Sequence, residues 1–442
     1  MEQARKNIFV FGADDFNLSL IRSMDTENRY QLHRLYDYSE IKAGWEFPVK
    51  KLYEGAQQKL REFQGTVDGI VGYWDFPVST LLPLLRAPYH LASPSLESVL
   101  KCEHKYWSRL EQREVIPDLI PDFCAVDPFA DDYRAQITLD YPFWIKPIKS
   151  ASSYLGFKVR NDSELAHAIG EIRSGISRWG NPFNYVLNFA RLPEEVAPVN
   201  GNWCLAEGII STGRQCTLEG YVYDGKVTVY GIVDSIREGK HRSSFSRYQY
   251  PSSIPRRIRQ QMISVTDRFL SHIGFDNGPF NVEFYWNRHS DQIWLLEINT
   301  RISKSHCPLF QKVDGQAHHK IMVELGLGER PHFPHREGAY RLAAKFMWRV
   351  YENAIVRKVP TNTALKGIQK RFPEADIELH VAPGEKLSSL KDQDSYSYEI
   401  AVVFLGANSQ KELLRKYHEI QDSLGIELEP VPGTKQPQHT GT

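Results

Sequence analysis

Two short runs of alternating residues around a polar turn constrain the fold of this chain more than any other feature. The runs are "GPFNVEFYW" and "QIWLLEINTR", and "NRHSD" separates them. Because the side-chain period is two, each run predicts a strand, and the pair predicts an antiparallel hairpin. One face is expected to carry Val282, Phe284, Trp286, Trp294, Leu296 and Ile298, and the other Asn281, Glu283, Tyr285, Leu295, Glu297 and Asn299.

The hairpin brings two carboxylates to one face. In one register Glu283 lies directly opposite Glu297, and in another it lies diagonal to Glu297; both separate the two by roughly 5–8 Å. A one-residue slip would expose the apolar face. Mg²⁺ prefers carboxylate and amide oxygens and leaves coordination positions for phosphates, so Glu283, Glu297 and Asn299 are candidate ligands. Arg301, one step beyond, suits a phosphoryl oxygen. A solvated or Arg/Lys-paired polar face stays open as the alternative.

The first hundred residues alternate strand-like and helix-like segments. "NIFVFGADD", "YQLHRLYD" and "VDGIVGYWD" read as strands, and "FNLSLIRSM" and "YEGAQQKLREFQ" read as helices, which predicts a parallel sheet. The absence of G-x-G-x-x-G after the first strand argues against a dinucleotide site. Further along, we expect a helix over "CEHKYWSRLEQREV", a helix capped by Asp162 or Ser163, and a hairpin turn at Asp224–Gly225.

Composition excludes several classes of protein. The 442 residues suggest two to four domains, and 54 Lys and Arg balance 54 Asp and Glu, so nothing draws the whole chain to nucleic acid or a membrane. The five cysteines are scattered and form no C-x-x-C, which disfavours disulfides and zinc sites and fits a reducing compartment. The run "IFVFGA" is too short to span a bilayer. We therefore expect a cytoplasmic protein.

Other candidate residues have an ordinary structural alternative when taken singly. Lys146 ends the apolar run "YPFWI", so it either extends to solvent or faces an anion. The following "KSASSYLG" is rich in small residues and could lie over phosphates through its N–H groups. Glu207 and Ile210 in "AEGIISTGRQ" could contact a purine or belong to a plain strand and turn. Lys105 could be a surface residue of a helix.

The order of these features resembles the ATP-grasp superfamily of carboxylate–amine ligases. The resemblance covers roughly residues 100–330, and "GPFNVEFYW…WLLEINTRIS" is its most specific part. It implies an ATP-grasp fold of mixed α/β and α+β class, with an N-terminal Rossmann-like parallel-sheet domain at 1–100. The ATP-grasp domain would span 101–330 and an α+β closing domain 331–430, followed by a disordered tail at 431–442.

The resemblance also implies roles for particular residues. ATP phosphates would meet Lys105 and Lys146, with residues 150–156, including Ser152 and Ser153, closing over them. Glu207 and Ile210 would lie around adenine, and Gln215 would stand where the family often has a ribose-binding Glu. Glu283, Glu297 and Asn299 would hold Mg²⁺, which Mn²⁺ could replace. Arg301 would stabilise the transferred phosphoryl group.

The expected activity is ATP-dependent activation of a carboxylate as an acyl phosphate, which an amine then attacks. The substrates would be small molecules, without nucleic acid or membrane, and a homodimer is compatible with this class. Two alternatives stay open: a biotin-carboxylase-like enzyme acting on bicarbonate, and an inactive nucleotide-binding protein. "EINTRISKSH" resembles the biotin carboxylase stretch, but that family has Val-Glu where this chain has Lys304-Ser305. The polar segment "EGKHRSSFSRYQYPSS" is expected to be mobile, with Arg242 and Arg247 available to a substrate carboxylate.

Overall fold

The computed structural model describes residues 5–151, 154–211, 213–238, 244–390, 393 and 397–431. Ser152, Ser153, Arg242 and the predicted tail beyond residue 431 lie outside these ranges. Packing divides the chain into two compact units. The first comprises 1–232, 254–304 and 318–333, and the second 233–253, 305–317 and 334–442. The domain boundaries expected from the sequence stay a prediction, because these units follow packing and the chain passes repeatedly from one to the other.

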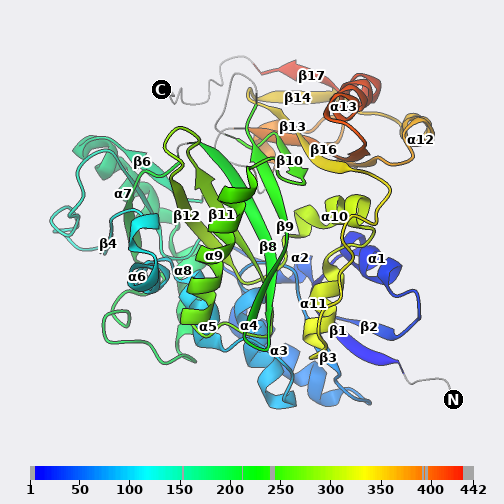
Figure 1. The fold of residues 1–442 in the computed structure, drawn as a ribbon. Coiled ribbons are helices and arrows are strands. Elements are labelled where there is room, and N and C mark those ends of the chain that lie inside the picture. Colours follow the sequence, from blue (N-terminus) through cyan, green and yellow to red (C-terminus); the bar gives the residue numbers. More distant parts are fainter. Residues whose placement is uncertain are drawn as a thin grey trace. The chain divides into compact units, whose positions relative to one another are not determined.

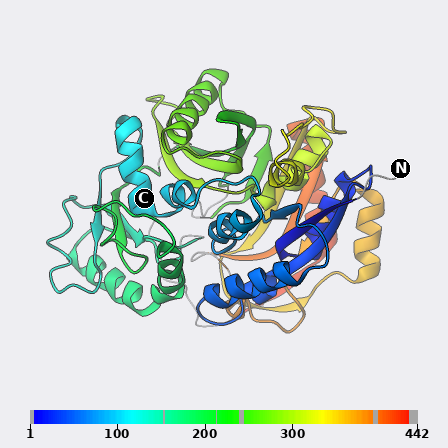
Figure 2. The same cartoon turned by 90° about the horizontal axis from the view of Figure 1, so that it is seen from below.

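The first unit begins with the parallel sheet that the sequence predicts. Its strand order is β2-β1-β3, with β1 (Lys6–Ala13), β2 (Tyr30–Asp37) and β3 (Gly69–Val71). The connecting helices are α1 (Asp15–Met24), α2 (Tyr38–Ile41) and α3 (Val49–Glu62), and α4 (Val78–Arg86) follows β3. Leu52, Ala56 and Leu60 on one stripe of α3 join the core that the strands build. Figure 2 shows α3 running alongside these strands, in blue.

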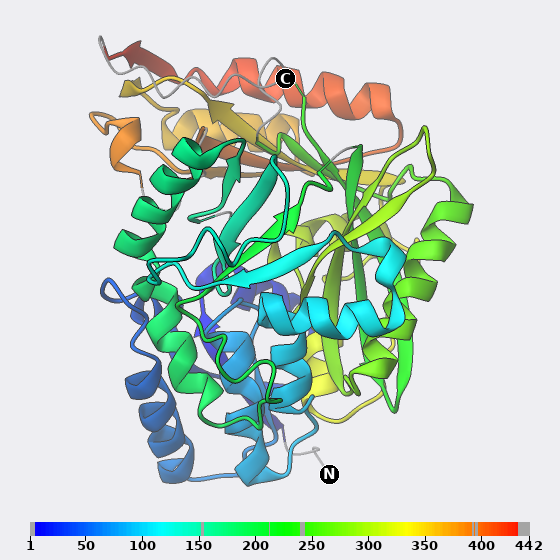
Figure 3. The same cartoon turned by 90° about the vertical axis from the view of Figure 1, so that its left-hand side faces the viewer.

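A second sheet of four antiparallel strands follows, in the order β4-β7-β5-β6. It consists of β4 (Phe123–Val126), β5 (Phe143–Pro147), β6 (Phe157–Val159) and β7 (Cys204–Gly208). Helix α7 (Asp162–Gly175) packs on this sheet through Leu165, Ile169 and Ile172, as Figure 3 shows in teal. Helix α8 (Ser177–Leu187) comes next. The cap of α7 is Asn161, which accepts from the Glu164 N–H at 2.9 Å, rather than Asp162 or Ser163.

The helix predicted over residues 102–115 is interrupted. It consists of α5 (Leu96–Glu103) and α6 (Lys105–Val115), which meet at His104. His104 is extended, at φ −84° and ψ 99°, and its Nδ1 accepts from the Trp107 N–H, so it caps α6. The break sets Lys105 at the first turn of a new helix.

The third sheet region of this unit contains the predicted hairpin. It runs β12-β11-β8-β9, with β8 (Arg214–Tyr223), β9 (Lys226–Ile236), β11 (Gly278–Trp286) and β12 (Ile293–Asn299). The turn between β8 and β9 has φ 50° at Asp224 and 68° at Gly225, the left-handed pair that the sequence predicts. Helix α9 (Arg256–His272) packs along β8, β11 and β12 (Figure 1) through Met262, Val265 and Phe269. Helix α11 (His319–Gly326) also belongs to this unit.

The second unit is an α+β assembly. Strands β10 (Arg247–Tyr250), β13 (Leu342–Val350), β16 (Tyr398–Ala407) and β15 (Asp376–Leu379) pair antiparallel in that order beside the end of β9. β14 (Ala354–Lys358) pairs with β17 (Glu427–Pro430). The helices are α10 (Cys307–Asp314), α12 (Asn362–Arg371) and α13 (Gln410–Leu424), and the last two share a core with β13 and β16.

One expectation about the second unit is wrong. Arg247, placed in a mobile segment by its polar neighbours, is the first residue of a strand between β9 and β13. Its side chain is 6% exposed and its Nη2 donates to Glu238 at 2.8 Å. Pairing on both edges overrides the polar composition of the stretch, because ladder hydrogen bonds satisfy the backbone whatever the side chains are.

Among the residues that the structure describes, none of the helices has the length and apolarity that a bilayer crossing requires.

Candidate active site

The two acids of the hairpin are direct cross-strand partners. Glu283 of β11 stands opposite Glu297 of β12, and Asn281 stands opposite Asn299. Of the two registers that keep the carboxylates on one face, the structure therefore has the closer one. Two neighbouring carboxylates repel each other, and this arrangement favours a cation between them.

A β-bulge corrects the predicted faces of β12. Phe284 pairs with Leu295, so Leu296 has no partner on β11. Leu295 is therefore fully buried in the core beside Ile293 and Ile298, whereas the regular alternation placed it with Glu297. Trp294 is half-buried on the other side. One extra residue reverses the faces before the bulge and leaves those after it unchanged.

Amides flank the pair of acids. Gln215 of β8 donates from Nε2 to Glu283 at 2.8 Å, and its Oε1 is buried with no hydrogen-bond partner. Asn299 donates from Nδ2 to the Asn281 side chain at 2.9 Å, which leaves its Oδ1 for another ligand. A hard cation prefers oxygen ligands of this kind. The site offers two carboxylates, the unpaired Gln215 Oε1 and the Asn299 Oδ1. The described residues contain no cluster of three or more His, Cys, Asp or Glu suited to a metal.

Lys146 neither extends to solvent nor stands alone. Its ammonium group pairs with Glu207, whose other oxygen receives Arg109 Nη2 at 3.0 Å and Nε at 3.1 Å. Burial alone would raise the pKa of Glu207, but Lys146 and Arg109 hold it down at about 2. Glu207 therefore carries a fixed negative charge that orients Lys146 on β5.

Arg109 also binds the β-bulge. Its Nη1 donates to the Leu295 carbonyl at 3.0 Å and its Nη2 to the Leu296 carbonyl at 3.1 Å. In a regular strand successive carbonyls point in opposite directions, so one guanidinium group reaches both only because the strand is bulged. Arg109 thereby ties α6 to β7 and to the candidate metal strand.

Lys105 lies among the other charged groups of the site. Its Nζ donates to the Ser150 carbonyl at 3.1 Å, at the start of the predicted phosphate loop. Burial lowers its pKa to about 8, against the attraction of the Glu297 carboxylate. Lys149 and Lys146 lower it further. Three lysines whose ammonium groups repel one another favour a polyanionic ligand.

Arg301 belongs to a second charged cluster. Its Nη2 donates to Asp75, which follows β3, at 3.2 Å. Lys149 contacts Asp75 at 3.5 Å and donates to Glu103 at 2.7 Å. Burial opposes ionisation of Asp75, yet Lys149 and Arg301 hold its pKa well below the usual range. Glu103 also accepts from the Thr300 hydroxyl at 2.7 Å.

Two further residues singled out from the sequence are Ile210 and Lys304. Ile210 is buried in the connection from β7 to β8. Ser152 and Ser153 lie outside the described residues. Lys304, which departs from the biotin carboxylase pattern, has its ammonium group 3.6 Å from the ring centroid of Trp74.

Sequence reasoning missed four charged residues of the site, although each left a signal. Arg109 lies four residues after Lys105, hence on the same helix face. Lys149 is the second lysine of "IKPIK", and Glu103 precedes Lys105 by two residues. Asp75 follows the last parallel strand, at the edge where ligands of such sheets bind.

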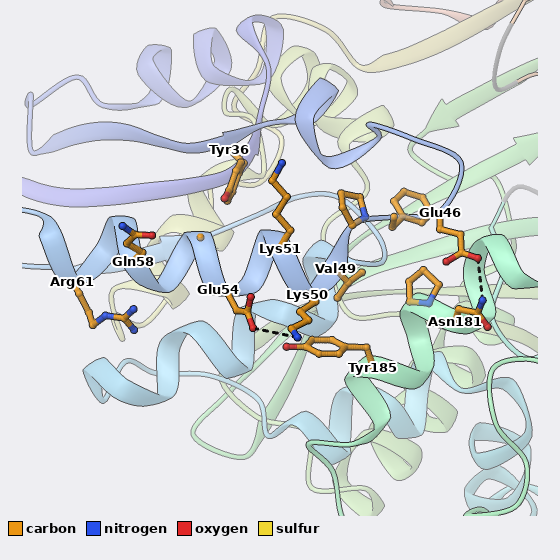
Figure 4. A pocket seen from close by; sticks show the side chains of 14 residues that line it. Tyr36, Glu46, Val49, Lys50, Lys51, Glu54, Gln58, Arg61, Asn181 and Tyr185 are labelled. Atoms are coloured by element: carbon orange, nitrogen blue, oxygen red, sulfur yellow. Dashed lines mark hydrogen bonds and ion pairs between the residues drawn. The ribbon is translucent and has the colours of Figure 1, made fainter.

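A cavity of about 830 Å³ lies elsewhere in the first unit. Figure 4 shows it between α3 and α8, with Tyr36 and Tyr185 among its lining. Two contacts join residues of its lining: Lys50 lies 4.0 Å from Glu54, and Asn181 donates to Glu46 at 3.0 Å. None of the predicted site residues lines it.

Comparisons with known proteins identify the fold that carries these residues. A family model described as ATP-grasp domain matches residues 139–307. The uncharacterized protein y4rH of Sinorhizobium fredii is 22% identical over 326 residues, which are 71% of this chain and 59% of that protein. The chain thus spans less than two thirds of that curated relative.

Solved structures show the same fold across nearly the whole chain. L-amino acid ligase from Bacillus licheniformis superposes with a TM-score of 0.69 at 15% identity, over 96% of this chain and 99% of that one. The biotin carboxylase domain of Hydrogenobacter thermophilus 2-oxoglutarate carboxylase gives 0.64 at 15% identity, over 97% and 92%. Residues 139–307 therefore form an ATP-grasp domain, and the chain as a whole has the ATP-grasp fold.

Proposed function

We propose that this protein is an ATP-dependent carboxylate–amine ligase, which forms an amide bond and releases ADP and phosphate. The observation that carries the proposal is that Glu283 stands opposite Glu297 in a segment that matches the ATP-grasp domain, with the Lys105 ammonium group attracted by the Glu297 carboxylate. The similarity in fold to an L-amino acid ligase supports amino acids as substrates.

The donor set fits Mg²⁺ or Mn²⁺. Glu283, Glu297 and Asn299 would hold the ion, and the orphaned Gln215 Oε1 lies beside Glu283. The H. thermophilus structure was determined with MgADP, which supports the same pairing of metal and nucleotide for this chain. When bound, the ion would neutralise phosphate charge and align the terminal phosphoryl group.

Positively charged side chains of this protein would stabilise the negative charge that develops during the reaction. A carboxylate oxygen attacks the terminal phosphorus of ATP, the bond to ADP breaks, and an acyl phosphate forms. Lys105 and Lys146 would hold the phosphates, and Arg301 would meet the oxygens on which charge redistributes. The amine nitrogen next attacks the acyl carbon; phosphate leaves and the nitrogen loses a proton.

A bicarbonate-activating enzyme is the second candidate, because the fold matches a biotin carboxylase domain almost as well. Lys304-Ser305 stands where that family has Val-Glu, the Glu being the residue expected to act on bicarbonate. A serine, Ser305, in place of that acid favours the ligase. An inactive nucleotide-binding protein is disfavoured by the complete set of Glu283, Glu297, Asn299 and Arg301.

The deciding experiment is a screen for ADP release with amino-acid pairs, against bicarbonate and biotin in parallel. We expect release that depends on an amine, with amide product found by mass spectrometry. Glu297→Gln should abolish turnover while the fold and much of the nucleotide affinity persist. Glu111→Gln is a matched control, since Glu111 lies on α6, 3.1 Å from the Lys101 ammonium group and 2.9 Å from the His272 ring. Release with bicarbonate alone, or full activity of the Glu297 variant, would contradict the proposal.

A further inference from the structure

The residues that follow the candidate metal strand are held by side chains from several elements. We call residues 299–303 the Arg301 loop. At its start, Asn281 on β11 accepts from Asn299 and donates to the Arg301 carbonyl at 3.1 Å. Thr300 is bonded to Glu103 at the end of α5, and Ile302 is fully buried. These contacts fix the first four residues of the loop.

Two further side chains hold its end at Ser303. Glu219 on β8, the cross-strand neighbour of Asn281, accepts from the Ser303 N–H at 3.3 Å. His318, at the start of α11, contacts the Ser303 carbonyl from Nε2 at 2.9 Å. The N–H and the C=O of one peptide residue are thus each held by a separate charged or ionisable side chain.

The chemistry of the contacts fixes the tautomer of His318. A carbonyl oxygen only accepts, so Nε2 must carry the proton. In the neutral ring, Nδ1 is then an acceptor, and the Tyr230 hydroxyl lies 2.9 Å from it. The Glu219 carboxylate lies 3.8 Å from the same nitrogen. The Tyr230 hydroxyl is placed to donate to Nδ1, which favours the neutral tautomer that donates to Ser303.

Burial makes this network costly to maintain. Glu219 and His318 are both completely buried. Buried polar groups cost free energy unless fully bonded, and apolar residues would fill the same volume more cheaply. The network surrounds the peptide of Ser303, two residues beyond Arg301. Without it, the position of the Arg301 side chain would depend mainly on the ion pair with Asp75.

We propose that His318, oriented by Tyr230 and acting together with Glu219, is a positioning residue: it fixes the Ser303 peptide and so aims Arg301 at the transferred phosphoryl group. The inference rests on the proposed function for Arg301, and assigns a task to three residues outside the predicted site. Because small misplacements of a catalytic group can lower a rate about a hundredfold, such a clamp can matter without touching substrate.

The first test needs no turnover. Amide hydrogen exchange of the full chain, followed by mass spectrometry, reports the protection of the Ser303 N–H. His318→Leu and Tyr230→Phe should both increase exchange at Ser303, and His318→Gln, whose amide can still donate, should restore protection. His319→Gln is the matched control: His319 is equally buried but contacts Asn17, at 3.0 Å. Unchanged exchange at Ser303 in Tyr230→Phe and His318→Leu would overturn the clamp.

The second test is a double-mutant cycle on ADP release. If His318 acts through Arg301, His318→Leu should lower kcat about tenfold or more alone, with little change in KM for ATP, and much less in an Arg301→Lys background. Tyr230→Phe, which loses one atom, covers the case in which the leucine variant fails to fold. Equal rate losses in both backgrounds would reduce His318 to a purely structural residue. If the unaltered protein shows no turnover with any substrate, the proposed function fails, and the exchange result alone decides whether the clamp exists.

Discussion

Single residues of the site are tuned by what surrounds them, and Lys105 shows this most clearly. Its pKa of about 8 lies far enough below that of an exposed lysine for its charge to change near neutrality. A phosphate binds the protonated form. Affinity for ATP should therefore be constant below pH 8 and fall above it, approaching tenfold per pH unit.

Calorimetric titration with ATP at pH 7, 8 and 9 measures this dependence. Lys105→Arg keeps its charge throughout and should bind equally at all three values. Lys101→Arg, on the neighbouring helix, should retain the fall. If the unaltered protein and Lys105→Arg follow the same profile, Lys105 does not carry the phosphate interaction.

Arg301 gives a second prediction for a single residue. A planar guanidinium group can bridge two oxygens as charge shifts between them, whereas lysine offers a point charge. Arg301→Lys should lower kcat by about a hundredfold, with a smaller change in KM for ATP. If Arg301 served only its ion pair with Asp75, the variant would lose thermal stability and keep its kcat. Melting temperature and kcat measured on one preparation separate these outcomes.

At the scale of elements, one bulge and one arginine join a helix to the site. Arg109 holds Glu207 and the Leu295 and Leu296 carbonyls through one fork of donors. Lysine can replace the charge but cannot reach all three. Arg109→Lys should reduce the free energy of unfolding by about 1–3 kcal/mol, because buried acceptors lose their partners.

Urea denaturation of Arg109→Lys and Arg113→Lys gives a matched comparison on α6. Arg113 is 52% exposed and lies 3.8 Å from Glu195, so its substitution should change stability by less than about 0.5 kcal/mol. Equal midpoints for the two variants would show that the bulge does not depend on Arg109.

At the scale of the whole molecule, each compact unit has its own core and its own charged groups, so pH acts on them differently. In the second unit, His380 donates hydrogen bonds to the carboxylates of Glu378 and Glu399, and these raise its pKa to about 9. A raised folded-state pKa stabilises below the unfolded value of about 6.5, and this stabilisation is lost as pH rises through 9. Thermal stability should therefore fall between pH 6.5 and 9.5.

The slope of melting temperature against pH tests this expectation. His380→Asn should flatten it, while His289→Asn, on the exposed turn between β11 and β12, should keep the original slope. An unaltered slope in the His380 variant would place the pH dependence in other groups.

The sequence by itself determined the elements whose signal is local. Period-two alternation gave β11 and β12, and the chain alternation of strands and helices gave the parallel sheet. The order of the candidate residues along the chain, which resembles that of the ATP-grasp superfamily, predicted the ATP-grasp fold. Side-chain periodicity is a property of neighbouring residues, so it can be read without the fold. The facing of Glu283 and Glu297 followed from it, although both compatible registers remained open until the strands were paired.

Tertiary structure decided what depends on residues distant in sequence. The bulge at Leu296 has no signature in "WLLEIN", because its extra residue is stabilised by Arg109, 187 positions away. Asp75 contacts Arg301 although 226 positions separate them in the sequence. His318 contacts Ser303 although residues 305–317, which belong to the other compact unit, lie between them in the chain. Arg247 is a strand residue because two other strands pair with it. Local pattern indicates which face a side chain takes in a regular strand, whereas packing decides where the strand bulges and which partners share a face.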